Sequence, residues 1–132
     1  MVSLQAFEQY HADLGRVWER QTLLKARPCA GEARTGELAL EMISDLLARA
    51  PAPDVQALHG MRLRMERERG SQGAEAGIHL KLGPGGMADI EFWASICQLM
   101  RWAEDPRVRT TRTVKVIQWM RDSGAISEKE GE

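Results

Sequence analysis

The segment from Lys81 to Glu91 carries the strongest chemical signal in this sequence. A lysine precedes a turn that contains three glycines and a proline, and the turn opens into an apolar helix with acidic residues in its first turn. Glycine permits tight turns and close approach to the backbone. The first N–H groups of a helix attract anions, since they lie at the positive end of its dipole. The segment therefore predicts a turn that faces a phosphate. Its candidate residues are Lys81, Gly83, Gly85 and Gly86.

Asp89 and Glu91 are the two acidic residues at this helix start. Residues two apart on an α-helix point about 200° away from each other, so these carboxylates do not chelate one metal ion together. We expect each to act singly, one facing the glycine turn and the other pairing with an arginine of a neighbouring helix. A plain chain reversal before a buried helix explains the glycines and the proline at least as well as a phosphate site does.

Arginines on two further predicted helices are candidates for anion binding. Arg20 and Arg27 are seven residues apart, so they share one helix face and are able to hold a phosphate or carboxylate together. A solvated face, in which Glu19 lies near Arg20, is an equal alternative. A later helix mixes arginines with glutamates, a pattern typical of a solvated surface. Its arginines are Arg62, Arg64, Arg67 and Arg69.

Other chemistries find no support in the residue pattern. The three histidines, His11, His59 and His79, fall in different elements without the spacing of a zinc site. Cys29 and Cys97 are far apart and form no CxxC motif, so we expect reduced thiols. No serine or cysteine has the histidine and acid of an activated nucleophile. We therefore predict no metal site and no catalytic residue in this chain.

Length and composition fit a single domain over residues 1–132. The 132 residues are 43% apolar and 28% charged, which allows one moderate core. Eighteen basic residues against 19 acidic ones give a net charge of −1, so no overall charge draws the chain to nucleic acid or an anionic membrane. No apolar run approaches the ~18 residues of a membrane span, and the N-terminus lacks a signal-peptide pattern. We expect a cytoplasmic protein.

The apolar spacing predicts an all-α bundle of about five helices. They are expected over residues 3–26 with a bend at Gly15, then 35–50, 54–69, 87–103 and 113–122. Ser3 and Asp54 are the expected N-caps, and Gly124 is expected to end the last helix. The segment 87–103 is the longest apolar helix and the expected core helix. A short extended segment over 78–82, before the glycine turn, is an additional expectation.

Three ordered motifs resemble the bacterial glutamine synthetase adenylyltransferase family. They are Trp18-Glu19-Arg20-Gln21 with Leu24-Lys25-Ala26-Arg27, then Met61-Arg62 with Arg64-Met65-Glu66 and Glu68, then the run from Leu80 to Phe92. The resemblance extends from Leu4 to about Ile126, and it is greater to the adenylylating C-terminal half of the family than to the deadenylylating N-terminal half. Family members attach AMP from ATP to a tyrosine of glutamine synthetase and remove it by phosphorolysis, in response to the PII signalling protein and glutamine.

The resemblance implies that this chain is the helical domain that follows a nucleotidyltransferase core. In the family, that core carries an Asp-x-Asp pair and a third acid, which hold the metal ions that align ATP. This sequence has no Asp-x-Asp, so we expect a chain truncated at both ends, inactive alone and without a bound cofactor of its own. ATP and Mg²⁺ belong to the complete enzyme. The implied partners are glutamine synthetase, a PII-type protein and a separate nucleotidyltransferase core.

The resemblance also implies roles for the candidate residues. The glycine turn with Lys81, together with Arg20 and Arg27, is expected to face the nucleotide. Asp89, Glu91 and Glu19 are expected to form a polar network around it. The family usually has an acid where this chain has His79, and commonly a glutamine where it has Ser95.

Two other functions compete with an adenylyltransferase part. One is a non-catalytic module that binds glutamine synthetase or a PII-type regulator. The other is a gene remnant without an independent role. In each case the apolar helix at 87–103 predicts exposed apolar patches on the isolated chain.

Overall fold

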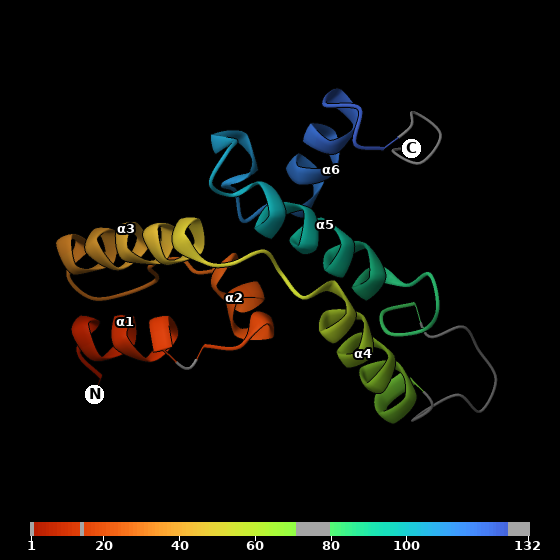
Figure 1. Ribbon diagram of the computed structural model, residues 1–132, viewed down its shortest axis with the longest axis horizontal. Coiled ribbons are helices and arrows are strands. Elements are labelled where there is room, and N and C mark those ends of the chain that lie inside the picture. The colour runs from red at the N-terminus through yellow and green to blue at the C-terminus, as the bar shows by residue number, and fades with distance from the viewer. Residues whose placement is uncertain (1, 14, 71–79, 127–132) are drawn as a thin grey trace.

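Six α-helices make up most of the chain that the structure describes (Figure 1). The computed structural model describes residues 2–13, 15–70 and 80–126. The helices are α1 (Leu4–Asp13), α2 (Val17–Leu23), α3 (Ala33–Arg49), α4 (Val55–Met65), α5 (Met87–Arg101) and α6 (Thr113–Asp122). A π-helical turn, Glu66–Gly70, continues α4, and a 3-10 turn, Pro106–Val108, precedes α6. Within the described residues no strand is present, and the predicted all-α class is confirmed.

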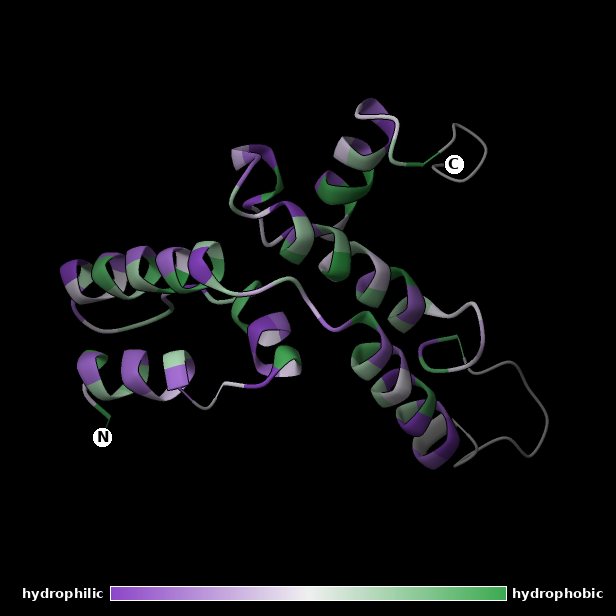
Figure 2. Cartoon of the chain, in the orientation of Figure 1, coloured by the Kyte–Doolittle hydropathy of each residue, from purple (hydrophilic) through white to green (hydrophobic). Residues whose placement is uncertain are grey.

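The helices form two groups that meet at α2. In the first group α1 lies beside α3, and in the second α5 contacts both α4 and α6 (Figure 1). The short helix α2 touches α4 and α5. Figure 2 shows apolar and hydrophilic residues alternating around α3, as expected for a helix buried on one side. The buried core consists of Leu24, Ile43, Leu47, Ala94, Trp102, Val108, Val116, Trp119 and Met120.

The predicted first helix, 3–26 with a bend, is wrong, because the chain breaks into α1 and α2. At Gly15 the backbone passes so close to α1 that an added Cβ would lie 2.6 Å from the carbonyl oxygen of His11. Arg16 is extended, with φ −83° and ψ 158°, and serves as the N-cap residue of α2. The carboxylate of Glu19 accepts a hydrogen bond from the N–H of Arg16 (2.6 Å). Local capping therefore starts a new helix where the apolar spacing predicted a continuous one.

The other predicted boundaries are mostly close to the observed ones. Ser3 and Asp54 accept hydrogen bonds from backbone N–H groups three residues later, at 3.1 and 2.9 Å, so both N-caps are confirmed. The last helix has the predicted bounds, and Gly124 follows it with φ 72° in the left-handed region. The extended segment predicted over 78–82 is wrong for residues 80–82, which form a turn, while 78 and 79 lie outside the described residues.

Helix α5 is buried along one face. Its buried residues are Ala88, Ala94, Ser95, Ile96 and Gln98, most of them small or polar. Small side chains let neighbouring helices approach closely, which favours this face for packing against α2 and α4. Ile90, Trp93 and Met100 are therefore left exposed. Helix α5 thus contributes Ala94 to the core, as expected of a core helix, and the predicted exposed apolar patch is confirmed.

Asp105 connects the loop after α5 to α6. Its carboxylate accepts hydrogen bonds from the Arg107 side chain, with the shortest at 2.7 Å, and from the indole N–H of the buried Trp119 (2.7 Å). The Asp105 carboxylate also accepts a hydrogen bond from the backbone N–H of Arg107 (2.9 Å), and this bond caps the 3-10 turn. The hydrogen bonds from Arg107 are the main reason that the pKa of Asp105 lies well below its usual range. The ionised carboxylate thus holds Trp119 and the loop together.

We expect Asp105→Asn to lower the melting temperature at pH 7, because an amide neither pairs with Arg107 nor accepts as strongly from Trp119. A lowered folded-state pKa adds stability above the ordinary aspartate pKa, and that stability is lost as the pH falls. The difference in melting temperature between wild type and Asp105→Asn should therefore become smaller below pH about 4. Thermal unfolding followed by circular dichroism at pH 7 and pH 3 measures this. Asp122→Asn, at an exposed pair with Arg121, is the control, and an Asp105 effect independent of pH would contradict the assignment.

Candidate functional site

Backbone carbonyls of the glycine turn accept hydrogen bonds from the first N–H groups of α5 and so cap this helix. The N–H of Met87 donates to the carbonyl of Leu80 (3.0 Å), and the N–H of Ala88 donates to the carbonyl of Lys81 (2.9 Å). The N–H of Asp89 donates to Gly86 (3.0 Å). These are the N–H groups that a phosphate at the helix start would need. The predicted cradle of free backbone amides is therefore wrong, since the turn itself satisfies them.

Gly85 and Gly86 are required by this turn for different reasons. Gly85 has φ 71°, in the left-handed region, and its N–H donates to Oδ2 of Asp89 (2.7 Å). Gly86 is extended and buried, and an added Cβ would lie 2.8 Å from the carbonyl oxygens of Leu80 and Gly83. Gly85 thus permits a left-handed turn, and Gly86 permits a close path of the backbone.

Arg62 fixes the glycine turn from α4. Its side chain is only 5% exposed, and Nη2 donates to the carbonyls of Leu82 (3.0 Å) and Gly83 (3.3 Å). Nε lies 2.6 Å from Oδ1 of Asp89, an ion pair whose angle is not that of a hydrogen bond. Nη1 lies 3.5 Å from the carboxylate of Glu66, one turn further along the chain. A buried guanidinium with carbonyl and carboxylate partners joins α4, the turn and α5 at one point.

Asp89 fills both roles that the sequence analysis expected of two separate residues, Asp89 and Glu91. One carboxylate oxygen accepts from the glycine turn, and the other pairs with Arg62 of the neighbouring helix. Glu91 is exposed and lies on another side of α5, where it lines a shallow pocket of about 240 Å³ with residues of α2. The pocket residues are Gln21, Thr22, Lys25, Glu91, Phe92 and Ser95. Glu91 is therefore placed apart from the Arg62 cluster.

Lys81 is the candidate residue of the turn that still offers a cation. Lys81 is exposed, and its ammonium forms no ion pair with any of the described residues. Its carbonyl is already used to cap α5. The turn therefore presents the Lys81 side chain on a backbone that is held by Arg62 and Asp89. An anion at this corner would be recognised by a mobile point charge and not by a set of backbone amides.

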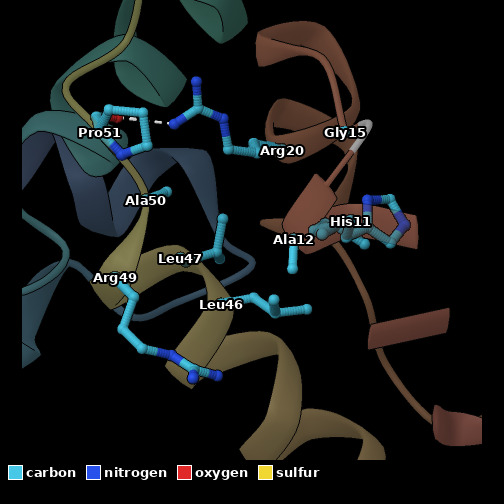
Figure 3. A pocket seen from close by; sticks show the side chains of 10 residues that line it. His11, Ala12, Gly15, Arg20, Leu46, Leu47, Arg49, Ala50 and Pro51 are labelled. Atoms are coloured by element: carbon cyan, nitrogen blue, oxygen red, sulfur yellow. Dashed lines mark hydrogen bonds between the residues drawn. The ribbon is translucent and has the colours of Figure 1, made fainter. Parts of the chain in front are cut away.

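Arg20 lies in a different place from the glycine turn. Its Nη1 donates to the carbonyl of Pro51 (2.6 Å), between α3 and α4, and burial lowers the pKa of its guanidinium. It lines a cavity of about 290 Å³ with residues of α1 and α3, and none of residues 81–86 line this cavity (Figure 3). Arg27 lies beyond the end of α2 and is exposed. The structure thus gives Arg20 a structural partner and does not bring it together with Lys81.

Glu19 belongs to the contact between α1 and α2. It accepts a hydrogen bond from the hydroxyl of Tyr10 (2.7 Å) in addition to the N–H of Arg16. The Tyr10 hydrogen bond is the main cause that lowers the pKa of Glu19 and, in return, raises the pKa of Tyr10. The structure therefore places Glu19 outside the network of Asp89.

The sequence interpretation treats Arg62 only as one of several arginines typical of a solvated surface, and it assigns no site role to Gln21. Arg62 follows Leu58 by four residues and precedes Met65 by three, so its place on the buried stripe of α4 was available as a signal. Gln21 donates to Oγ of the buried Ser95 (2.5 Å) and ties α2 to α5. The Ser95 hydroxyl in turn donates to the carbonyl of Phe92 (2.8 Å).

Comparisons with known proteins agree with the motifs. Residues 1–42 match the family model of glutamate-ammonia ligase adenylyltransferase, and residues 56–132 match that of GlnD PII-uridylyltransferase. Bifunctional glutamine synthetase adenylyltransferase/adenylyl-removing enzymes of Streptomyces coelicolor and Bradyrhizobium diazoefficiens are each 36% identical over 132 and 130 residues. The enzyme of Cutibacterium acnes is 35% identical over 131 residues. Each alignment covers 96% of this chain. The chain belongs to the glutamine synthetase adenylyltransferase family.

The match to these adenylyltransferases covers a small share of their length. The chain spans 13% of each of the three relatives. Among the described residues, no three or more histidine, cysteine, aspartate or glutamate side chains are grouped so that they could hold a metal ion. In the same part of the chain, no helix combines the length and apolar character needed to span a membrane.

We expect Arg62→Gln to lower the free energy of unfolding by about 2–4 kcal/mol, because it removes the charge that pairs with Asp89 and leaves turn carbonyls without their donor. The amide of Gly85, bonded to Asp89, should exchange faster with solvent. Arg64→Gln, at an exposed position two residues later, should stay within about 0.5 kcal/mol of wild type. Urea unfolding and amide hydrogen exchange measure both effects. Equal losses in the two variants would show that Arg62 has no special role in this adenylyltransferase segment.

A second prediction concerns Gly86. We expect Gly86→Ala to cost about 1–3 kcal/mol, because the new Cβ meets backbone oxygens that cannot move independently. Gly60→Ala on α4 is the matched control, since an added Cβ there meets nothing within 4 Å, and alanine should stabilise that helix by up to about 1 kcal/mol. Urea unfolding distinguishes them. Similar stability of Gly86→Ala and wild type would contradict the observed path of the turn.

Proposed function

We propose that this chain acts as the helical part of a glutamine synthetase adenylyltransferase. In this proposal the catalytic carboxylates, ATP and Mg²⁺ belong to a separate nucleotidyltransferase core, and glutamine synthetase is the protein substrate. The relatives that support the proposal are named as glutamine synthetase adenylyltransferases and match nearly the whole chain. The sequence itself has no Asp-x-Asp pair. The chain alone is then inactive and completes an active enzyme only with that core.

The observation that carries the proposal is the glycine turn with its exposed lysine. Arg62 and Asp89 fix the backbone on either side of the turn, so the position of Lys81 is set by two helices. A mobile cation on a fixed backbone, beside a core that binds a nucleotide, is suited to contact the phosphates, because charged hydrogen bonds to phosphate are strong. Lys81 is thereby assigned to the nucleotide. Arg20 is not, because its guanidinium is bonded to the carbonyl of Pro51, while Arg27 stays an exposed candidate beyond the end of α2.

The test uses a chimera in which this chain replaces the aligned segment of the Streptomyces coelicolor adenylyltransferase. Attachment and removal of AMP on glutamine synthetase are followed by intact mass with ATP and Mg²⁺. The chimera should attach AMP, whereas the isolated chain should attach none. A folded chimera that neither attaches nor removes AMP would contradict the proposal. An AMP adduct formed by the isolated chain would contradict it as well.

Lys81→Gln in the chimera should raise the KM for ATP about tenfold, as expected for one lost charge-assisted hydrogen bond. Its melting temperature should not change, because the Lys81 side chain is exposed and forms no ion pair with the described residues. Lys115→Gln, an exposed lysine on α6, is the matched control and should leave the KM unchanged. An equal KM for ATP in both variants would contradict the assignment of Lys81 to the nucleotide site.

A further inference from the structure

The cavity of about 290 Å³ between α1, α2 and α3 has walls that are mainly aliphatic (Figure 3). Ala12 of α1, Leu23 of α2, and Leu46 and Leu47 of α3 line it. Protein sites for small molecules are mostly apolar cavities with a few polar groups, and this volume is at the lower end of their range. The cavity is therefore of a size for a short organic molecule.

The ionisable residues that line the cavity are all basic. They are Arg20, Arg49 and His11, and the described lining residues include no aspartate or glutamate. Figure 3 shows the two arginines on opposite sides of Leu47. Arg49 already forms an ion pair with Glu8, at 3.3 Å. The lining thus favours an anion, whereas an ammonium group would find no carboxylate in the cavity.

Arg20 carries a charge in this cavity that no acid compensates. Its Nη1 donates to the carbonyl of Pro51, a neutral acceptor, and its guanidinium forms no ion pair with any described residue. The buried Arg62, by contrast, lies beside the carboxylates of Asp89 and Glu66. Taking a cation out of water costs free energy, and an anion offsets this cost better than a neutral group does. The half-buried Arg20 therefore favours an anionic partner.

We infer that this cavity binds a small aliphatic carboxylate, with the carboxylate group at Arg20 and the chain against Leu46 and Leu47. A guanidinium forms strong, charge-assisted hydrogen bonds with a carboxylate. Aliphatic walls stabilise an apolar chain through each methylene that they bury. Inorganic phosphate would instead place further charged oxygens against these side chains, which is unfavourable. The inference is independent of the proposed function, since none of residues 81–86 line this cavity.

Pentanoate is the probe that tests this inference on the whole chain, followed by proton–nitrogen NMR correlation spectra. It should shift the backbone amide signals of Ala12, Leu23 and Leu47 in a saturable way. The affinity should rise about fourfold for each methylene added from acetate to pentanoate. Pentanol, with the same chain but no charge, should bind at least about tenfold more weakly. Pentylamine should not bind.

Three results with these probes would overturn the inference. Equal binding of pentanol and pentanoate would show that the cavity selects no charge. Inorganic phosphate that binds as tightly as pentanoate would assign the site to an inorganic anion. No saturable shift with any probe would mean that the cavity holds water only.

Two variants locate the site of pentanoate binding. Arg20→Gln should weaken it at least about tenfold, because a charge-assisted hydrogen bond is lost. Since Arg20 also holds Pro51, Ala12→Phe tests the cavity without disturbing that bond, and its larger side chain should abolish binding. Ala6→Phe, exposed on the same helix but not lining the cavity, is the matched control and should leave binding unchanged. Wild-type binding by a folded Ala12→Phe variant would overturn the inference.

Discussion

The guanidinium of Arg62 is the group on which the candidate site depends. It is buried between α4 and the glycine turn, where its partners are two backbone carbonyls and the carboxylates of Asp89 and Glu66. A buried cation is tolerated only when such partners surround it, so the turn must keep the path that supplies them. An irregular segment is thereby tied to both α4 and α5.

This arrangement changes how the turn can recognise an anion. A glycine-rich segment before a helix is commonly read as a cradle of backbone amides, but here the amides of Met87 and Ala88 are bonded to the carbonyls of Leu80 and Lys81. The Gly85 amide is bonded to Asp89. In the proposed function, the group offered to a ligand is the side chain of Lys81, on a backbone that Arg62 and Asp89 hold.

The sequence predicted those features that depend on local signals. Ser3 and Asp54 cap helices through hydrogen bonds to N–H groups three residues later. The bounds of α6 were predictable because its apolar spacing and the terminating Gly124 are both signals within one short segment. The roles of Arg62 and Arg20 depend on partners 20 to 31 residues away, at Leu82 and Pro51. Mixed charge and helical spacing carry no information about such partners.

A double-mutant cycle between Arg62 and Asp89 tests most directly whether their pairing organises the turn. The free energy of unfolding is measured by urea titration for wild type, Arg62→Gln, Asp89→Asn and the double variant. If the two side chains act through each other, the double variant loses less stability than the sum of the single losses, and the coupling is about 1–3 kcal/mol. Additive losses, with a coupling below about 0.5 kcal/mol, would contradict the account, because each residue would then act on its own.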